Sequence, residues 1–157
     1  MSRGLLTFMA TVTHLALVVL TIGLLFYVTD DDVIVERDAG TTLGPAMVFG
    51  SMAAVFFVLA RSFGVAGRDG ESRAPAILRP SLLAAVGSYV VMLLIGSLLY
   101  ALRRDEAVWL VLFAGRYAGS AFVIVSSVWA GVVVAGFLLL ARFESARAVR
   151  DAHHDDL

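Results

Sequence analysis

The chain contains no cysteine and no lysine, so all of its 12 basic residues are arginine. The absence of cysteine excludes disulfides, thiol catalysis and cysteine-ligated metal sites. The net charge is −1, which gives no basic surface for nucleic acid, and we expect no nucleic-acid partner. Charged residues make up only 16% of the chain, whereas hydrophobic residues make up 60%. This balance is typical of a chain solvated by lipid.

Motifs that would indicate a reaction are also missing. The sequence has no HExxH, GxSxG or P-loop pattern and no zinc-finger spacing. All 13 acidic residues lie outside the long apolar runs, which weighs against proton-coupled export through a membrane-embedded acid. We therefore predict a protein that is not an enzyme and that has no cofactor and no metal site.

Four long apolar runs fill most of the 157 residues: Leu5–Val28, Leu43–Ala60, Ser81–Leu102 and Ala107–Ala141. A helix needs about 20 apolar residues to cross the hydrocarbon core of a bilayer. The first run is longer than the apolar region of a signal peptide and has no small-residue cleavage site, so we expect it to be retained. The sequence predicts an all-α, four-helix transmembrane bundle in one domain over residues 1–157. The expected spans are about 5–28, 43–62, 81–102 and 116–141.

The fourth run is too long for one span. Its 35 residues would extend about 52 Å as a helix, well beyond the thickness of the hydrocarbon core. We expect Ala107–Ala114 to lie at the outer interface or above it. Gly115 would mark a bend, and the span would begin near Arg116.

The arginines predict the orientation. Eight lie before the first run, between the second and third runs or after the fourth, and at most four lie on the other side. Because arginine-rich loops stay in the cytoplasm, both termini should face inward across the plasma membrane, with residues 142–157 as a cytoplasmic tail.

The connecting segments carry weak signals. Residues 29–42 hold five acids but lack the EF-hand spacing, so a solvated acidic loop is favoured over a calcium site. Residues 61–80 contain three glycines and two prolines and read as a flexible linker. His153 and His154 lie in a charged tail, where a solvated segment is favoured over a metal cluster.

Polar residues within the apolar runs are the candidate functional residues. Thr7, Thr11 and His14 share one face of the first helix. His14 could act in proton relay or gating, because the unperturbed pKa of histidine is near neutrality. The structural alternative is a neutral histidine that is hydrogen-bonded across helices, with threonines that bond their own helix.

A second polar group lies on the fourth run, where Arg116, Ser120 and Ser127 share a face. Arg116 would be functional if it were buried in a straight helix. It would reach the outer interface if the span begins near Gly115, and we favour this second interpretation.

Small residues form faces that let membrane helices approach closely. Ala46, Gly50 and Ala53 align on the second span, and Gly115 and Gly119 align on the fourth. We expect these faces to hold the bundle together or to contact another copy or a different subunit.

In composition and topology the chain resembles small four-span actinobacterial integral membrane proteins without an assigned function, and the exclusive use of arginine fits a GC-rich genome. No motif accompanies this resemblance, so no functional residue follows from it. We expect a non-enzymatic accessory or scaffold subunit in the lipid bilayer that packs against a partner membrane protein or itself. The alternative is a small oligomeric channel or transporter with a pathway lined by Thr7, Thr11 and His14.

Overall fold

The computed structural model describes residues 2–29, 41–68 and 77–155, and within them it contains helices and no strand. The helices are α1 (Arg3–Thr29), α2 (Leu43–Arg68), α3 (Leu78–Arg104), α4 (Val108–Tyr117) and α5 (Ala121–Asp155). All except α4 are long and apolar enough to cross a membrane. The predicted all-α fold with four membrane-spanning helices is therefore confirmed.

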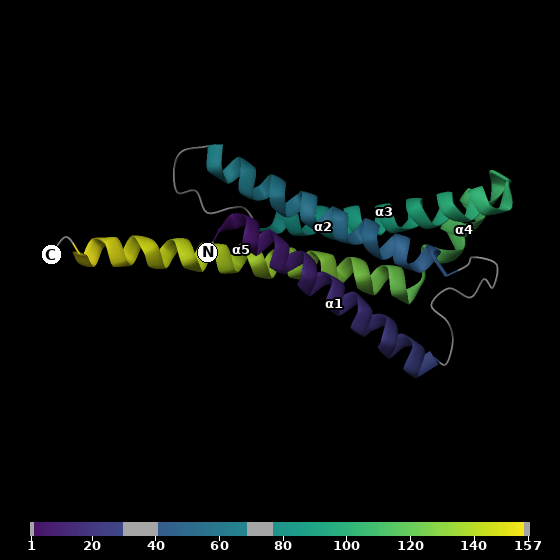
Figure 1. Cartoon of the computed structure of the whole chain (residues 1–157), viewed down its shortest axis with the longest axis horizontal. Coiled ribbons are helices and arrows are strands. Elements are labelled where there is room, and N and C mark those ends of the chain that lie inside the picture. The colour runs from purple at the N-terminus through teal and green to yellow at the C-terminus, as the bar shows by residue number, and fades with distance from the viewer. Residues whose placement is uncertain (1, 30–40, 69–76, 156–157) are drawn as a thin grey trace.

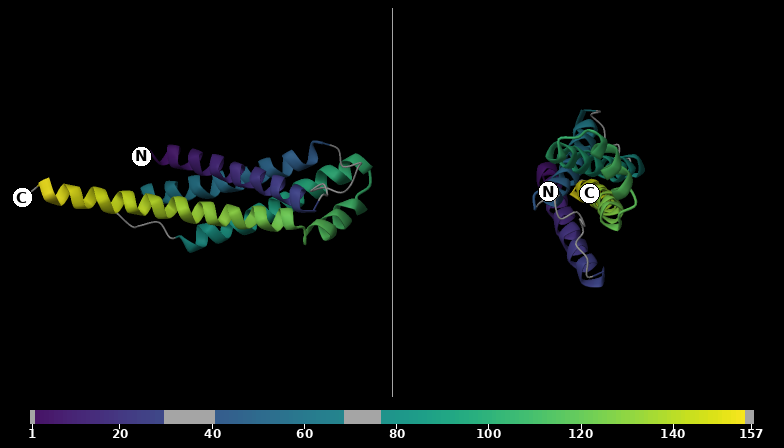
Figure 2. Two further views of the ribbon diagram at one scale, coloured as in Figure 1. Left: turned by 90° about the horizontal axis from the view of Figure 1, so that it is seen from below. Right: turned by 90° about the vertical axis from the view of Figure 1, so that its right-hand side faces the viewer.

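The four long helices lie side by side in an elongated bundle (Figures 1 and 2). α3 packs against α2, α4 and α5, and α1 packs against α2 and α5. Both chain termini lie toward the same end of the bundle, which we call the terminal end, and α4 lies at the opposite end (Figure 1). α5 continues well past the other helices at the terminal end (Figure 2).

Each long helix buries a row of side chains spaced four residues apart, because such residues lie on one face of a helix. The rows are Leu6, Ala10, His14 and Val18 on α1; Leu43, Met47, Ser51, Val55, Leu59 and Phe63 on α2; Ala84, Ser88, Met92, Gly96 and Tyr100 on α3; and Phe122, Ser126, Ala130, Val134 and Leu138 on α5. Each row contains one histidine or serine among apolar residues, so the interior of the bundle is not uniformly apolar.

The connection between α2 and α3 is shorter than the linker expected at residues 61–80. α2 continues to Arg68 and α3 begins at Leu78, so helix replaces both ends of the predicted linker. Pro80 lies in the first turn of α3, where a residue without a backbone N–H is tolerated because those N–H groups have no partner within the helix. The acidic segment 30–40 lies outside the described residues, and so do the side chains of His153 and His154.

The fourth apolar run forms two helices. After a left-handed turn at Asp105 (φ 55°), α4 packs back against α3. The contact is close, because a Cβ built on Gly96 would lie 2.8 Å from Cε1 of Phe113. The helical run ends at residues 118–120 and not at Gly115, so Arg116 belongs to α4 and the long helix begins at Ala121.

The break between α4 and α5 uses a side chain from α3. The Tyr89 hydroxyl donates a hydrogen bond of 2.8 Å to the carbonyl of Ala118. The Ser120 carbonyl accepts from the N–H of Ile124 at 3.0 Å and starts the next helix. An unpaired backbone group in hydrocarbon costs several kcal/mol, so the Tyr89 bond stabilises the break.

Candidate functional site

His14 lies in the middle of α1 and is fully buried. Its Nε2 lies 2.7 Å from Oγ of Ser51 on α2, and that oxygen lies 2.6 Å from Oγ of Ser88 on α3. Ser51 and Ser88 are also fully buried. One continuous hydrogen-bonded group thus joins three helices, and we call His14, Ser51 and Ser88 the central polar group.

The hydrogen bonds of this group have a preferred direction. Ser88 can donate to the Met92 sulfur, 3.9 Å away, which accepts but cannot donate. Ser51 then donates to Ser88, and the Nε2–H of His14 donates to Ser51. This order uses every proton of the group and leaves only a lone pair on Nδ1, whereas the other tautomer would bury an unpaired N–H. The central polar group therefore favours neutral histidine protonated on Nε2.

The chemistry open to this arrangement is limited by its surroundings. A histidine nitrogen within hydrogen-bond reach of a serine hydroxyl is the pair that activates a nucleophile in many hydrolases. Here Nδ1 has no partner to orient the ring, and both His14 and Ser51 are fully buried. In the described part of the chain no three His, Cys, Asp or Glu side chains form a group that could hold a metal ion. The geometry serves best to fix α1, α2 and α3 at one depth.

The threonines of the same face bond their own helix. Thr7 donates to the Arg3 carbonyl at 3.0 Å, and Thr11 donates to the Thr7 carbonyl at 2.9 Å. Thr21 donates to its own helix as well, and it accepts a 3.1 Å bond from the indole nitrogen of Trp129 on α5. The helix backbone thus satisfies the hydroxyls of Thr7 and Thr11, and neither bonds to His14.

The polar group predicted on the fourth run is separated by the break at residues 118–120. Arg116 is exposed in the last turn of α4, where its positive charge interacts favourably with the negative end of the helix dipole. Ser120 is half-buried between the two helices, and Ser127 is buried and donates to the Val123 carbonyl at 2.6 Å. The shared face was predicted for one continuous helix, whereas the structure divides these residues between the end of α4, the break and α5.

Some of the predicted packing residues are buried between helices and others are exposed on the surface of the bundle. Gly50 is buried where α2 meets α3, and a Cβ built there would collide with Ile95 and lie 2.9 Å from Cγ1 of Val91. Ala46 is half-buried, whereas Ala53, Gly115 and Gly119 are exposed. Gly115 and Gly119 have nothing within 4 Å of a built Cβ. The exposed residues therefore do not pack helices within the described part of this chain.

Comparison with protein families matches residues 3–154 to DUF6121, a family of unknown function. The chain belongs to the DUF6121 family. The matched region extends from the start of α1 almost to the end of α5, so it contains the central polar group and the break before α5. Comparison with curated proteins and with solved structures finds no match.

Sequence reasoning on this DUF6121 chain identified His14 but not its partners. Ser51 and Ser88 were not among the predicted polar candidates. The available signal was the four-residue spacing, since Ser51 interrupts an apolar row that runs from Leu43 to Phe63. The spacing alone does not show which polar residues share a depth, because that depends on how the helices are aligned.

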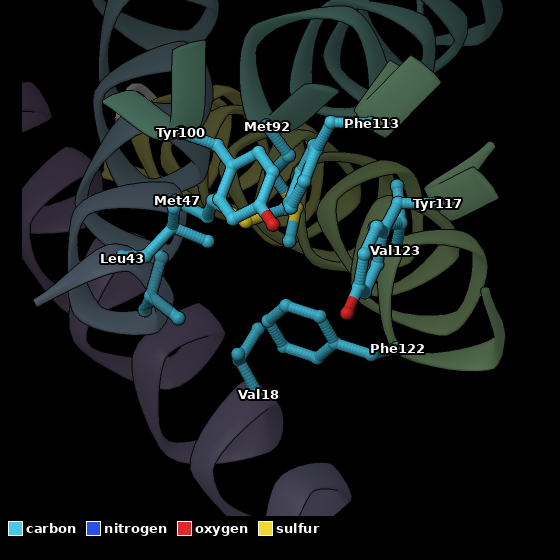
Figure 3. Packing of buried hydrophobic residues seen from close by; sticks show 10 residues of the cluster. Val18, Leu43, Met47, Met92, Tyr100, Phe113, Tyr117, Phe122 and Val123 are labelled. Carbon is cyan, nitrogen blue, oxygen red and sulfur yellow. The ribbon is translucent and has the colours of Figure 1, made fainter. Parts of the chain in front are cut away.

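A second feature of the DUF6121 chain is an aromatic cluster that holds α4 against α3. The rings of Phe113 and Tyr117 stack at 4.3 Å, and Tyr100 lies 5.1 Å from Phe113 (Figure 3). The Arg104 guanidinium lies over the Trp109 ring at 4.6 Å. Such contacts each contribute about 0.5–1.5 kcal/mol beyond simple burial, so α4 is anchored although it is short.

Proposed function

We propose that this chain is a non-enzymatic accessory or scaffold subunit that packs against partner helices in the bilayer. The observation that carries the proposal is the exposure of the C-terminal end of α1. From Gly23 to Thr29 only Leu25 is half-buried and every other residue is exposed. This segment leaves the bundle at an angle (Figures 1 and 2). We call Gly23–Thr29 the open segment.

The open segment is large, apolar and aromatic. Leu24 is 60% exposed, Phe26 is 52% exposed and Tyr27 is 85% exposed. Membrane helices associate through close packing, because lipid tails are as apolar as leucine and supply no hydrophobic force between helices. A span that is packed over only part of its length leaves the rest for lipid or for a partner helix. The exposed Gly115 and Gly119 offer a second surface that a helix can approach closely.

The interior supports the same proposal. The hydroxyls of Thr7, Thr11 and Ser127 bond their own helices, and the central polar group joins helices to one another. These bonds stabilise a bundle and leave few polar groups available to bind a solute. We further propose that the protein lies in a bacterial plasma membrane with the terminal end in the cytoplasm, which the arginine distribution supports.

Site-specific photocrosslinking in native membranes tests the partner. A photoreactive amino acid replaces Phe26 in the open segment, and a matched control replaces Leu98 on α3, which is 51% exposed. We expect one protein adduct of defined mass from position 26 and lipid adducts alone from position 98. Purification in mild detergent, with the mass and the co-purifying proteins measured together, then identifies the partner or a second copy. Lipid adducts alone at both positions, together with the mass of a single chain, would contradict the proposal.

A small oligomeric channel or transporter is the second candidate. The observation in its favour is a buried histidine beside two serines in the centre of the bundle. The pathway would include Thr7, Thr11 and His14, although the first two hydroxyls bond their own backbone. Proton flux into liposomes, followed with a pH-sensitive dye, should then exceed that of protein-free liposomes, depend on pH and disappear in His14→Leu. Flux equal to that of protein-free liposomes would argue against a proton pathway.

A further inference from the structure

Each of the four long helices carries an arginine where its apolar span meets the terminal end of the bundle. These residues are Arg3 on α1, Arg61 on α2, Arg79 on α3 and Arg142 on α5, and each is the charged residue nearest the apolar span on that side. The first three are exposed, and Arg142 is half-buried. The terminal end therefore presents one cation from every helix that can cross the membrane.

Three of these arginines lie at similar distances from the central polar group. α1 and α3 begin at the terminal end and α2 ends there (Figure 1). Arg3, Arg61 and Arg79 lie 11, 10 and nine residues from the member of the central polar group on their own helix, which corresponds to about 14–16 Å. Half the thickness of the hydrocarbon core is about 15 Å. With the central polar group in the middle of the bilayer, these arginines lie at the level of the headgroups of one leaflet.

Contacts between the helices place the four arginines around one end of the core. Nη1 of Arg3 donates a 3.0 Å hydrogen bond to the carbonyl of Phe63, two residues beyond Arg61. The buried cluster that contains Phe63 also contacts Ile77 and Ala141, which lie within two residues of the arginines on α3 and α5. The arginines therefore surround the part of this cluster that lies at the terminal end.

The contact between Arg3 and Phe63 leaves room for an anionic group. The acceptor is a neutral carbonyl, so this bond orients the guanidinium without neutralising its charge. It uses one of the five N–H donors of the guanidinium. Gly4 and Gly64 directly follow the two bonded residues, and nothing lies within 4 Å of a Cβ built on either glycine. The oriented cation therefore lies beside open space at the contact between α1 and α2.

The arginines at the opposite end of the bundle have a different setting. Arg103 and Arg104 directly precede Asp105 and Glu106, whose carboxylates offset the charge of the two arginines. At the terminal end, the side chains that the structure describes include a single acid, Glu144. An anion should therefore bind at the terminal end in preference to the opposite one.

We propose that Arg3, Arg61, Arg79 and Arg142 form a belt that binds phospholipids with a net negative headgroup from the adjacent leaflet. A guanidinium donates two parallel hydrogen bonds to phosphate oxygens, and the negative potential of an anionic leaflet attracts arginines near its surface. Arg3 provides the most ordered contact, because its bond to Phe63 holds the guanidinium across α1 and α2. This inference does not depend on the proposed accessory role, since the ligand is a lipid and not a partner helix.

Native mass spectrometry of the full chain in a non-ionic detergent tests the belt. The probes are phosphatidylglycerol, whose headgroup has a net negative charge, and phosphatidylcholine, whose phosphate is balanced by a choline. We expect phosphatidylglycerol to form adducts at a lower lipid concentration than phosphatidylcholine. Removing two charges with Arg61→Gln and Arg79→Gln should weaken the apparent affinity for phosphatidylglycerol about 30-fold. Both residues are exposed, so the double variant should still fold.

The matched control combines Arg103→Gln with Arg116→Gln, which removes the same charge from two exposed residues at the opposite end. The affinity of this variant for phosphatidylglycerol should be unchanged. Equal affinity of the unmodified chain for the two lipids, or an equal loss in the two double variants, would overturn the proposal. Displacement of phosphatidylglycerol by inorganic phosphate, but not by chloride at the same ionic strength, would also overturn it, because the ligand would then be a soluble anion.

Discussion

The longer part of α1, residues 3–22, and the open segment are both strongly apolar, yet the first is packed along one face and the second is open. Leu6, Ala10, His14 and Val18 are buried in the packed part, whereas Leu24 and most of its neighbours are exposed in the open segment. Hydrophobicity therefore does not decide which part packs. The packed part contains His14, which bonds Ser51 on α2, and Thr21, which bonds Trp129 on α5. In a bilayer, hydrogen bonds and shape select the contacts.

The largest expected effect comes from filling a packed glycine. Gly50→Leu inserts a side chain where even a Cβ collides with Ile95, so the bundle should lose about 3 kcal/mol of stability or fail to fold. Gly119→Leu is the control, because nothing lies within 4 Å of its built Cβ. Unfolding in mixed micelles measures the stability of both variants. An equal loss of stability in Gly50→Leu and Gly119→Leu would contradict the distinction between packed and open positions. If Gly119 contacts a partner, Gly119→Leu should disrupt the assembly without destabilising the chain.

Removing the polar centre of the packed part of α1 should have a smaller effect. His14→Ala deletes the bond to Ser51 and leaves a cavity, which together should cost about 2 kcal/mol. Thr13→Ala, at the exposed neighbouring position, should change stability by less than about 0.5 kcal/mol. The partner crosslink from position 26 should persist in His14→Ala, and its loss in a folded variant would assign His14 a role beyond stability.

Tyr89→Phe tests the bond that holds the break between α4 and α5. The variant leaves the Ala118 carbonyl without the Tyr89 hydroxyl and should cost about 1 kcal/mol. Hydrogen exchange should become faster at the amides of residues 118–124 and stay unchanged in α2. Tyr27→Phe, at a tyrosine that is 85% exposed, serves as the control. Unchanged exchange at the break would show that the Tyr89 bond does not hold it.

The smallest effect is expected in the open segment. Leu24→Ala should change the stability of the isolated chain by less than about 0.5 kcal/mol, because its side chain is 60% exposed. Val18→Ala, six residues earlier at a fully buried position, should cost at least about 1 kcal/mol. A loss in Leu24→Ala as large as that in Val18→Ala would mean that the open segment packs against the bundle.

Hydropathy was sufficient to predict the number of spans, since the length of an apolar run is set by the thickness of the bilayer. It did not predict the break at residues 118–120, because the stabilising group, Tyr89, lies on another helix. It predicted helix ends poorly near Arg68, where charged and glycine residues remain helical. Boundaries of this kind depend on tertiary contacts and not on local composition.

The candidate site shows the same limit. His14 was recognisable as a polar residue in an apolar run, but the hydroxyls of Ser51 and Ser88 were not distinguishable from those of other small residues. Their role depends on the relative depth of three helices, which a single sequence does not contain. The predicted shared face of Arg116, Ser120 and Ser127 assumed one continuous helix, and the break between α4 and α5 interrupts that helix.

The position of Tyr89 also has a consequence for synthesis in the membrane. The ribosome completes α3 before it makes α4 and α5, so the hydroxyl that stabilises the Ala118 carbonyl is already available when the last apolar run emerges. Residues 107–141 carry a single charge, Arg116, so the whole run is apolar enough to enter the bilayer although it is too long to cross it as one straight helix. The break between α4 and α5 can then form against α3, which is already in place and supplies the Tyr89 hydroxyl.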